Sequence, residues 1–314
     1  MVETKQIHPL PSDELRRLQL TELELLIEFD RICRKNNIKY TIIGGTLLGA
    51  VRNRGFIPWD DDADVALLRS DYEAFLNACE QDLDSERFYV QDRFRTEGYR
   101  WGYGKLRRRN TSFIRSNTEH MPYEQGVYID IMPLDYVPNS RAGQLFCSII
   151  AYFFRKASWS EVGKRTEGNY FCKTLYSLVA LIPFPWLNQA YQTWTDRLNR
   201  RPTEYLSCLS VPLVTSKGHR GHWRYRSEWL MHLIEYEFEG YSLMGIRDFD
   251  LALRRKYGEY REPVRFSPVS LSSCRLLPLE EIEVEEGLKE AVQMREVKGM
   301  DLSDGKTQSV DSRS

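Results

Sequence analysis

The sequence predicts an α+β fold in which helices flank a mixed β-sheet, followed by a mostly helical C-terminal portion. Between residues 38 and 137, short β-branched and aromatic segments alternate with stretches whose apolar residues recur at helical spacing. After residue 139, longer apolar stretches separated by charged sequence replace this pattern. Of the 314 residues, 42% are hydrophobic, so the chain has enough apolar side chains to build a sizeable core.

The first predicted helix begins at Ser12, whose hydroxyl can accept a hydrogen bond from an orphan backbone N–H, and ends at Asn36. Apolar residues recur every three or four positions between these points. The β-branched and aromatic segment 38–43 is predicted as a buried strand. Two glycines end it, and the sequence TLLGAV begins a short helix.

Four further strands are predicted along the same part of the chain, at residues 63–68, 88–94, 105–114 and 126–137. Between the first two, Ser70 and Glu73 match the capping box S-x-x-E, which predicts a helix that begins there. Residues 1–138 are therefore predicted to form one unit, a mixed sheet flanked by helices.

The chain after this unit is divided into residues 139–298, predicted as mostly helical, and a polar, small-residue tail, 299–314, predicted to be disordered. A membrane span needs about 20 apolar residues. The apolar stretches 144–154 and 174–187 are shorter, and prolines interrupt the second.

Two interpretations of these stretches remain open. They are either buried core helices or segments that rest in a membrane interface, with Trp159, Phe184 and Trp186 at headgroup depth. The second interpretation would make the protein a peripheral membrane protein.

The charge balance excludes a general nucleic-acid binder. There are 44 basic and 45 acidic residues, whereas such a protein would carry a basic excess. The 6 cysteines are scattered, which is typical of reduced thiols. The N-terminal residues lack the apolar run of a signal peptide, so we expect a cytoplasmic protein, with the inner face of the cell membrane as a further location.

Three aspartates alternate in the segment IPWDDDADV: Asp60, Asp62 and Asp64. Alternate side chains of an extended chain point to one face, about 6–7 Å apart. Carboxylates crowded beside apolar residues repel one another unless a cation neutralises them, and oxygen ligands of this kind suit magnesium or manganese. The alternative is a solvated acidic loop.

Asp130 is a further candidate ligand, because it lies between Ile129 and Ile131 in a predicted buried strand. A charge in that position needs a partner, either the same metal ion or an arginine. Asp135, nearer the strand end, is predicted to be a structural acid.

Gly44, Gly45 and Thr46 lie where a predicted strand runs into a helix. Glycines allow close approach of the backbone, and the N–H groups at a helix N-terminus favour a phosphate. Most turns of this kind bind nothing, so the pattern alone is weak. A Gly-Gly-Thr turn, then D-x-D, then a distant aspartate is, however, the arrangement used by enzymes with the nucleotidyltransferase fold, in which the acids hold divalent ions.

The segment GGTLLGAVRNRGFIPWDDDADV, followed by RSDYEAF, resembles the LicD family, which includes bacterial phosphocholine transferases and, more remotely, fukutin-type sugar-modifying enzymes. The segments GYGKL, NTSFI, GVYIDIMPLDYVPNS and FEGYSLMGIRDFDLALRRKYGEY extend the resemblance to roughly residues 15–263. It implies a nucleotidyltransferase-like catalytic core in residues 1–138. Residues 139–298 would complete the domain as an acceptor-binding or membrane-proximal region.

The resemblance further implies a metal-dependent phosphotransferase. Such an enzyme moves phosphocholine, or a similar phosphorylated group, from a CDP-activated donor such as CDP-choline to a sugar hydroxyl. The acceptor would be a cell-surface glycan (lipopolysaccharide, teichoic acid or capsule), which can be lipid-linked. By this resemblance Asp62 and Asp64 are the ligands of Mg²⁺ or Mn²⁺, Asp130 is the third acid and a candidate base, and Gly45 and Thr46 form the phosphate cradle.

Three more residues are candidates for substrate binding. Arg52, up to two helical turns beyond the glycines, can reach a phosphate or be a surface residue. Lys105 can clamp a phosphate or belong to a solvated basic face. Trp59 can stack on a base or a choline headgroup, or be part of the core.

Two other functions stay open. A nucleotidyltransferase that releases pyrophosphate would need the same three aspartates. A non-catalytic glycan-binding protein of the same fold would have no use for three clustered charges.

Overall fold

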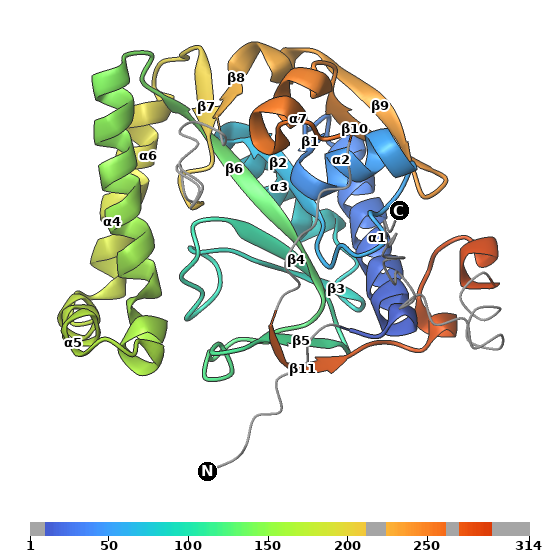
Figure 1. Cartoon of the computed structure of the whole chain (residues 1–314), viewed down its shortest axis with the longest axis horizontal. Helices are drawn as coiled ribbons and strands as arrows, with labels where there is room; N and C mark the ends of the chain where they lie inside the picture. The colour runs from blue at the N-terminus through green and yellow to red at the C-terminus, as the bar shows by residue number, and fades with distance from the viewer. Residues whose placement is uncertain (1–9, 212–223, 262–269, 291–314) are drawn as a thin grey trace, which may run out of the picture.

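The computed structural model describes residues 10–211, 224–261 and 270–290. Its central sheet has the strand order β3-β4-β6-β2-β1-β10-β9 (Figure 1). These strands are β1 (Thr41–Ile42), β2 (Asp64–Leu68), β3 (Phe88–Gln91), β4 (Gly104–Arg108), β6 (Tyr128–Val137), β9 (Leu233–Phe238) and β10 (Tyr241–Ile246). Strand β2 pairs with β6 and β1 with β10 in parallel, whereas the other pairs along this path are antiparallel. The sheet is mixed, and the predicted α+β class is confirmed.

Helix α1 (Ser12–Lys35) forms the centre of the main core. Its apolar residues recur at helical spacing, so Leu18, Leu25 and Phe29 fall on one face and are fully buried. The helix packs against α3 (Arg69–Asp82), where the rings of Phe29 and Phe75 lie 4.7 Å apart, and both helices contact β6. Helices α2 (Gly44–Asn53) and α7 (Phe249–Tyr257) pack against each other near β2.

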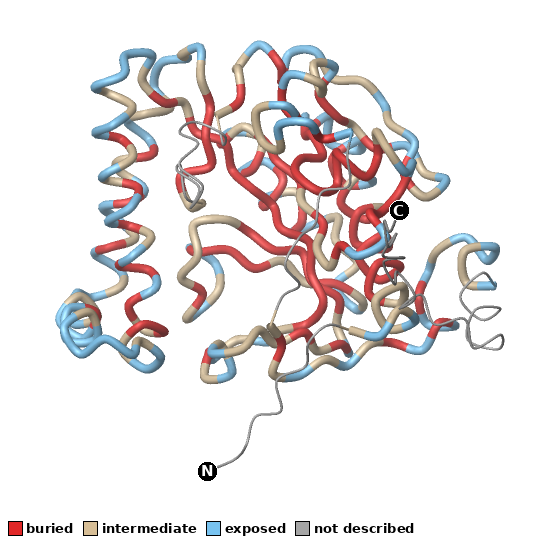
Figure 2. The backbone as a smooth tube through the Cα atoms, viewed as in Figure 1, coloured by how far each residue is buried: buried red, intermediate tan, exposed pale blue. Residues whose placement is uncertain are grey.

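Helices α4 (Arg141–Thr166), α5 (Tyr170–Val179) and α6 (Phe184–Asn199) form a helical arm beside the sheet, with α5 at the far end (Figure 1). Only parts of α4 and α6 are buried, and α5 is almost entirely exposed (Figure 2). The interpretation of residues 144–154 and 174–187 as core helices is therefore wrong for their outer faces. Within the described residues no single helix is long and apolar enough to cross a membrane; only the pair α5 and α6, bent by 84°, meets that test together.

The chain after the arm returns to the sheet. Residues of β10 pair with β1 at Ile42 and Gly245, so the central sheet draws strands from both sides of residue 139. The short strands β7 (Tyr205–Ser207) and β8 (Arg224–Arg226) extend from β6, and β11 (Leu271–Arg275) pairs with β5 (Ser112–Arg115). The 3-10 helices η1 (Ser227–Met231) and η2 (Leu279–Glu281) complete this part, whereas the predicted tail 299–314 lies outside the described residues.

Several predicted boundaries are wrong. Helix α3 begins at Arg69, directly after β2, so Ser70 lies inside its first turn and does not cap it. Pro11, not Ser12, occupies the cap position of α1. The predicted strand 105–114 is two strands, because a turn in which Asn110 has a φ of 61° separates β4 from β5. The predicted strands 38–43 and 88–94 shorten to β1 and β3, because only residues 41–42 and 88–91 pair with neighbouring strands.

Candidate active site

Two of the predicted acids are brought together by strand register. Asp64 begins β2, Asp130 lies in β6, and the two residues are directly paired across these parallel neighbours. Residues paired in this way project their side chains from the same face of the sheet. The sheet therefore places side by side two carboxylates that are far apart in the sequence.

The loop before β2 adds two more acids. Burial, together with the charges of Asp62 and Asp130, raises the pKa of Asp64 to about 8. Burial, together with Asp62 and Asp64, likewise raises the pKa of Asp60 to about 8. The pKa of Asp62 is raised by burial and by Asp130, although Arg115 and Lys256 oppose this shift. These acids form a cluster whose members destabilise one another's ionised forms.

Helix α1 contributes a further acid that the sequence analysis did not identify. Glu22 is 2% exposed, and within the described part of the chain its Oε2 has no hydrogen-bond partner. Burial raises its pKa well above the ordinary value, and the charges of Asp62, Asp61 and Asp60 add to the shift. The available signal was its spacing: Glu22 lies four residues after Leu18 and four before Leu26, on the apolar face of the helix.

Lys105 is the cation next to Asp130. It lies opposite Asp130 in the antiparallel pair β4 and β6, donates a hydrogen bond to Asp130 Oδ1, and its Nζ is 3.1 Å from the centre of the Tyr128 ring. Burial lowers the pKa of Lys105 to about 7; Asp130 opposes this shift, and Arg115 adds to it. Lys105, the residue predicted to clamp a phosphate, therefore lies in the site, where its ammonium group contacts the Asp130 carboxylate.

Lys256 in α7 is the second cation, and the sequence analysis missed it. Burial lowers its pKa, while Asp64, Asp62 and Asp60 raise it. It is the last of three consecutive basic residues in α7, and no local pattern distinguishes it from Arg254 or Arg255. Only the packing of α7 on α2 brings it to the acids.

The glycine turn makes room for the acid cluster. A Cβ on Gly45 would lie 2.3 Å from Asp60 Oδ2, and one on Gly44 would lie 3.0 Å from Asp64 Oδ2 and 2.7 Å from Lys256 Nζ. Gly44 also has a φ of +62°, which L-residues adopt at a cost. Thr46 Oγ1 accepts a hydrogen bond of 2.8 Å from the Asp64 N–H. The turn therefore contacts the acids directly.

Arg52 lies further from the cluster, whereas Trp59 adjoins it in the sequence. Arg52 is in the last turn of α2, about 12 Å along the helix axis from Gly44 at 1.5 Å per residue. Its guanidinium donates to the Tyr260 carbonyl at 3.4 Å. Trp59 precedes Asp60 and is 39% exposed, so its alternative as a core residue is wrong.

The acid cluster fits a hard divalent cation in its charge and donor chemistry. Asp62, Asp64 and Asp130 offer carboxylate oxygens, and their mutual repulsion is what a cation between them would remove. As the side chains stand, no group of three potential ligands within the described residues is arranged around a single point. Lys105 and Lys256 supply the positive charge in this arrangement.

Asp135 has the structural role predicted for it. It accepts two hydrogen bonds from Arg69, of 2.8 and 2.7 Å, and one of 2.7 Å from Asn199. The contacts join β6, α3 and α6, and Asp135 is fully buried. The hydrogen bond from Asn199 joins α6 of the arm to β6, and the ion pair joins α3 to the same strand.

The comparisons with known proteins define the class. Residues 37–155 match the family described as LicD/FKTN/FKRP, nucleotidyltransferase domain. The matched segment contains the glycine turn, the aspartates and Lys105. Residues 37–155 of this chain are therefore a LicD domain.

Over 253 residues the chain is 26% identical to the lipopolysaccharide cholinephosphotransferase LicD of Haemophilus influenzae; the match covers 78% of this chain and 91% of that protein. Shorter matches link it to uncharacterized proteins of two Rickettsia species. That of Rickettsia prowazekii is 48% identical over 52 residues, which is 17% of this chain and 20% of the relative. That of Rickettsia typhi is 40% identical over 68 residues, or 20% of this chain and 22% of the relative.

Proposed function

We propose that this protein is a phosphotransferase that moves phosphocholine from a CDP-activated donor to a sugar hydroxyl of lipopolysaccharide or a related cell-surface glycan, such as teichoic acid or capsule. One observation carries the proposal. Asp64 and Asp130 are paired in register beside Asp62, in a chain similar over most of its length to a cholinephosphotransferase.

Asp62, Asp64 and Asp130 would hold a magnesium or manganese ion. Such an ion, when bound, offsets the charge of the donor phosphates and lowers the pKa of a coordinated hydroxyl. Gly45 and Thr46, at the N-terminus of α2, present backbone N–H groups that favour phosphate oxygens.

In the transfer itself, the acceptor oxygen forms a bond to the phosphorus of phosphocholine, the bond from that phosphorus to the CMP oxygen breaks, and CMP leaves. Asp130 would receive the hydroxyl proton. The ammonium group of Lys105, which is hydrogen-bonded to Asp130, would stabilise the negative charge that develops on the phosphate oxygens during transfer.

We also propose that the helical arm contacts the membrane, at its inner face. The arm exposes large apolar side chains, namely Leu145, Phe146, Ile149, Phe153, Phe171, Leu175, Leu178, Leu181 and Trp186. Exposed apolar surface of this kind is typical of interaction sites, and a lipid-anchored acceptor would have to be reached at a membrane.

The test is an assay of the purified protein with CDP-choline, Mg²⁺ and lipopolysaccharide. We expect release of CMP and a mass increase of one phosphocholine on the acceptor. The double variant Asp62→Ala, Asp64→Ala should lose release by about a thousandfold or more, because the charge stabilisation of the transition state is lost. Glu73→Ala, which removes an exposed acid from α3, is the matched control and should keep full activity.

Activity that survives in the double variant would contradict the mechanism. Release of pyrophosphate from a nucleoside triphosphate, in place of CMP from CDP-choline, would identify a nucleotidyltransferase. A protein that binds the glycan and turns over none of the donors would be a non-catalytic glycan-binding protein.

A further inference from the structure

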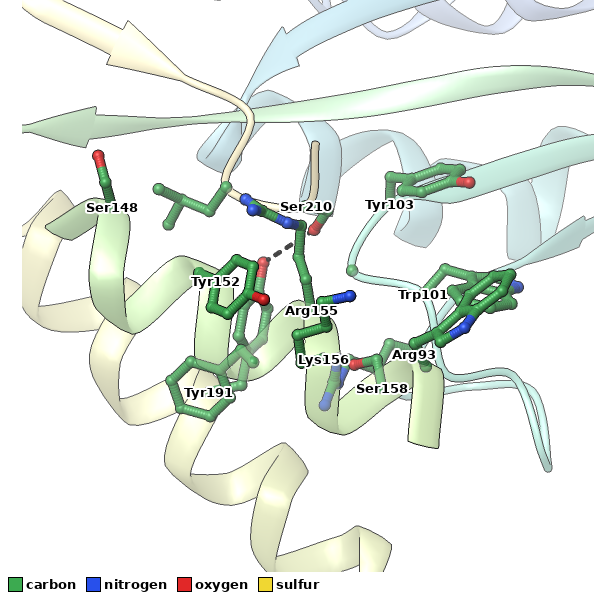
Figure 3. A pocket seen from close by; sticks show the side chains of 14 residues that line it. Arg93, Trp101, Tyr103, Ser148, Tyr152, Arg155, Lys156, Ser158, Tyr191 and Ser210 are labelled. Carbon is green, nitrogen blue, oxygen red and sulfur yellow. Dashed lines mark hydrogen bonds between the residues drawn. The ribbon is translucent and has the colours of Figure 1, made fainter. Parts of the chain in front are cut away.

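A cavity of about 670 Å³ lies at the base of the helical arm, and the sequence analysis did not predict it (Figure 3). It is bounded by α4, by Tyr191 of α6, by the segment that leads into β4, and by the residues after β7. The side chains that define its chemistry are Arg93, Trp101, Tyr103, Arg155, Lys156 and Trp159. It is separate from the acid cluster but adjoins it, because Tyr103 lines the cavity and its ring centre is 5.4 Å from the Nζ of Lys105.

The cavity is basic. Its lining contains Arg93, Arg155 and Lys156 and no acidic residue among those that the structure describes. Arg155 donates to the Val211 carbonyl and Lys156 donates to the Tyr176 hydroxyl, and both of these acceptors are neutral. Positive charges without carboxylate partners favour an anionic ligand.

Arg93 is the most buried of these cations, with 4% of its surface exposed. It donates to Asn188, to Ser158 and to the Arg100 carbonyl, and its Nη2 is buried with no partner in the described ranges. A buried guanidinium N–H without a partner favours an acceptor placed beside it.

The cavity is also aromatic. Trp101 and Trp159 lie 5.6 Å apart between ring centres, and Trp159 is 38% exposed. Tyr103, Tyr152 and Tyr191 add further rings and hydroxyl groups. Aromatic faces pack on the apolar C–H faces of sugar rings, while hydroxyl and guanidinium groups bond their polar edges.

We propose that this cavity binds an anionic sugar, bearing a phosphate or a carboxylate, of the acceptor glycan. The identification of this sugar as part of the acceptor rests on the proposed function, because the cavity would bind the second substrate of that reaction. The placement agrees with that role. Helix α4 contributes Arg155 and Lys156 to the cavity lining, and it also exposes Phe146 and Phe153. A lipid-anchored glycan that meets the arm at these apolar residues would therefore enter the cavity next to the acid cluster.

Binding of small probes in the presence of EDTA tests the inference without turnover. Glucose 6-phosphate and glucuronate, with glucose as the neutral comparison, are titrated into the full chain and followed by saturation-transfer NMR. We expect the two anionic sugars to bind about tenfold or more tightly than glucose, as a charge-assisted hydrogen bond predicts. Arg155→Gln and, independently, the exposed Lys156→Gln should each weaken the binding of glucose 6-phosphate by a similar factor.

Two controls separate this inference from the proposed function. Arg141→Gln removes an exposed arginine from the same helix, outside the cavity, and should bind as the wild type does. The double variant Asp62→Ala, Asp64→Ala should also bind glucose 6-phosphate normally, even though it releases no CMP. If the wild type bound glucose 6-phosphate as expected but failed in the transfer assay, the proposed function would be overturned and the anionic sugar site would still be supported.

Three results would overturn the inference: equal affinity of the wild type and both cavity variants, equal affinity for glucose and glucose 6-phosphate, or displacement of glucose 6-phosphate by CDP-choline. The last result would assign the cavity to the donor nucleotide.

Discussion

Gly45 is the residue at which packing constrains the acid cluster most directly. Its φ is not positive, so the requirement for glycine there is steric. The space that a Cβ would occupy belongs to the side chain of Asp60, which is 4% exposed and whose backbone carbonyl accepts a hydrogen bond from Gln19 of α1. A change at this position therefore acts on the carboxylates rather than on helix α2 itself.

Gly45→Ala is expected to displace Asp60 and its neighbours and to lower kcat/KM by about a hundredfold, the cost typical of a misplacement of about 1 Å in an active site. Steady-state assays of CMP release measure this effect. The matched control is Gly168→Ala, since a Cβ at Gly168 meets nothing within 4 Å. If both variants kept wild-type activity, the close approach of Gly45 to Asp60 would have no functional meaning.

At the scale of elements, the helical arm is joined to the sheet through a few polar and stacked contacts. Arg93 lies over the rings of Phe184 and Tyr191, and Arg69 pairs with Asp135 next to Asn199. Two small apolar clusters complete this packing: one joins α4 to Val137 of β6 and to Leu209, and the other joins α4 to α6. The outer surface of the arm takes no part in this packing and is available to a membrane.

Leu178→Glu in α5 is expected to weaken sedimentation with anionic phospholipid vesicles by about tenfold, because a charge replaces an apolar side chain that is 59% exposed. Ser177→Glu introduces the same charge on another face of the helix and serves as the control. Thermal unfolding of both variants should match the wild type, since neither side chain is buried. Equal vesicle binding by the two variants would show that the arm does not dock through this face.

For the molecule as a whole, the crowded acids make stability depend on pH. The pKa of Asp60 and that of Asp64 rise from the ordinary value of 3.8 to about 8 in the folded state. Between these values the folded state binds more protons than the unfolded state, so the free energy of unfolding decreases as pH rises. Lys105, with its pKa lowered to about 7, acts in the opposite direction above that pH.

In EDTA, the free energy of unfolding is expected to fall between pH 5 and 7, measured by denaturant titration. Asp60→Asn should flatten this dependence, because it removes one of the two shifted carboxyls. Added Mg²⁺ should stabilise the wild type more at pH 7 than at pH 5, since the acids bind it in their ionised forms. A dependence identical in the wild type and Asp60→Asn would mean that Asp60 titrates normally in the folded protein.

Local patterns in the sequence were sufficient for the α+β class, for the helical segments and for the acids as candidates. Apolar spacing predicted α1, and the alternation around Asp62 predicted side chains on one face, because both depend on residues a few positions apart. The isolated Asp130 was noticed because it interrupts an apolar strand. The predicted capping roles of Ser12 and Ser70 were wrong, because α1 is capped at Pro11 and α3 begins at Arg69, directly after β2.

Only the tertiary structure decided which residues meet. Segments that are distant in the chain meet at both sites. At the acid cluster, Asp64 pairs with Asp130, and Lys256 of α7 and Glu22 of α1 lie near the acids. The basic cavity is likewise lined by several separate segments. Strand register and helix packing are chosen by the burial of the whole core, which no short window of sequence contains. Residue types and local spacing thus specified the chemistry that is available, and long-range packing specified where that chemistry is assembled.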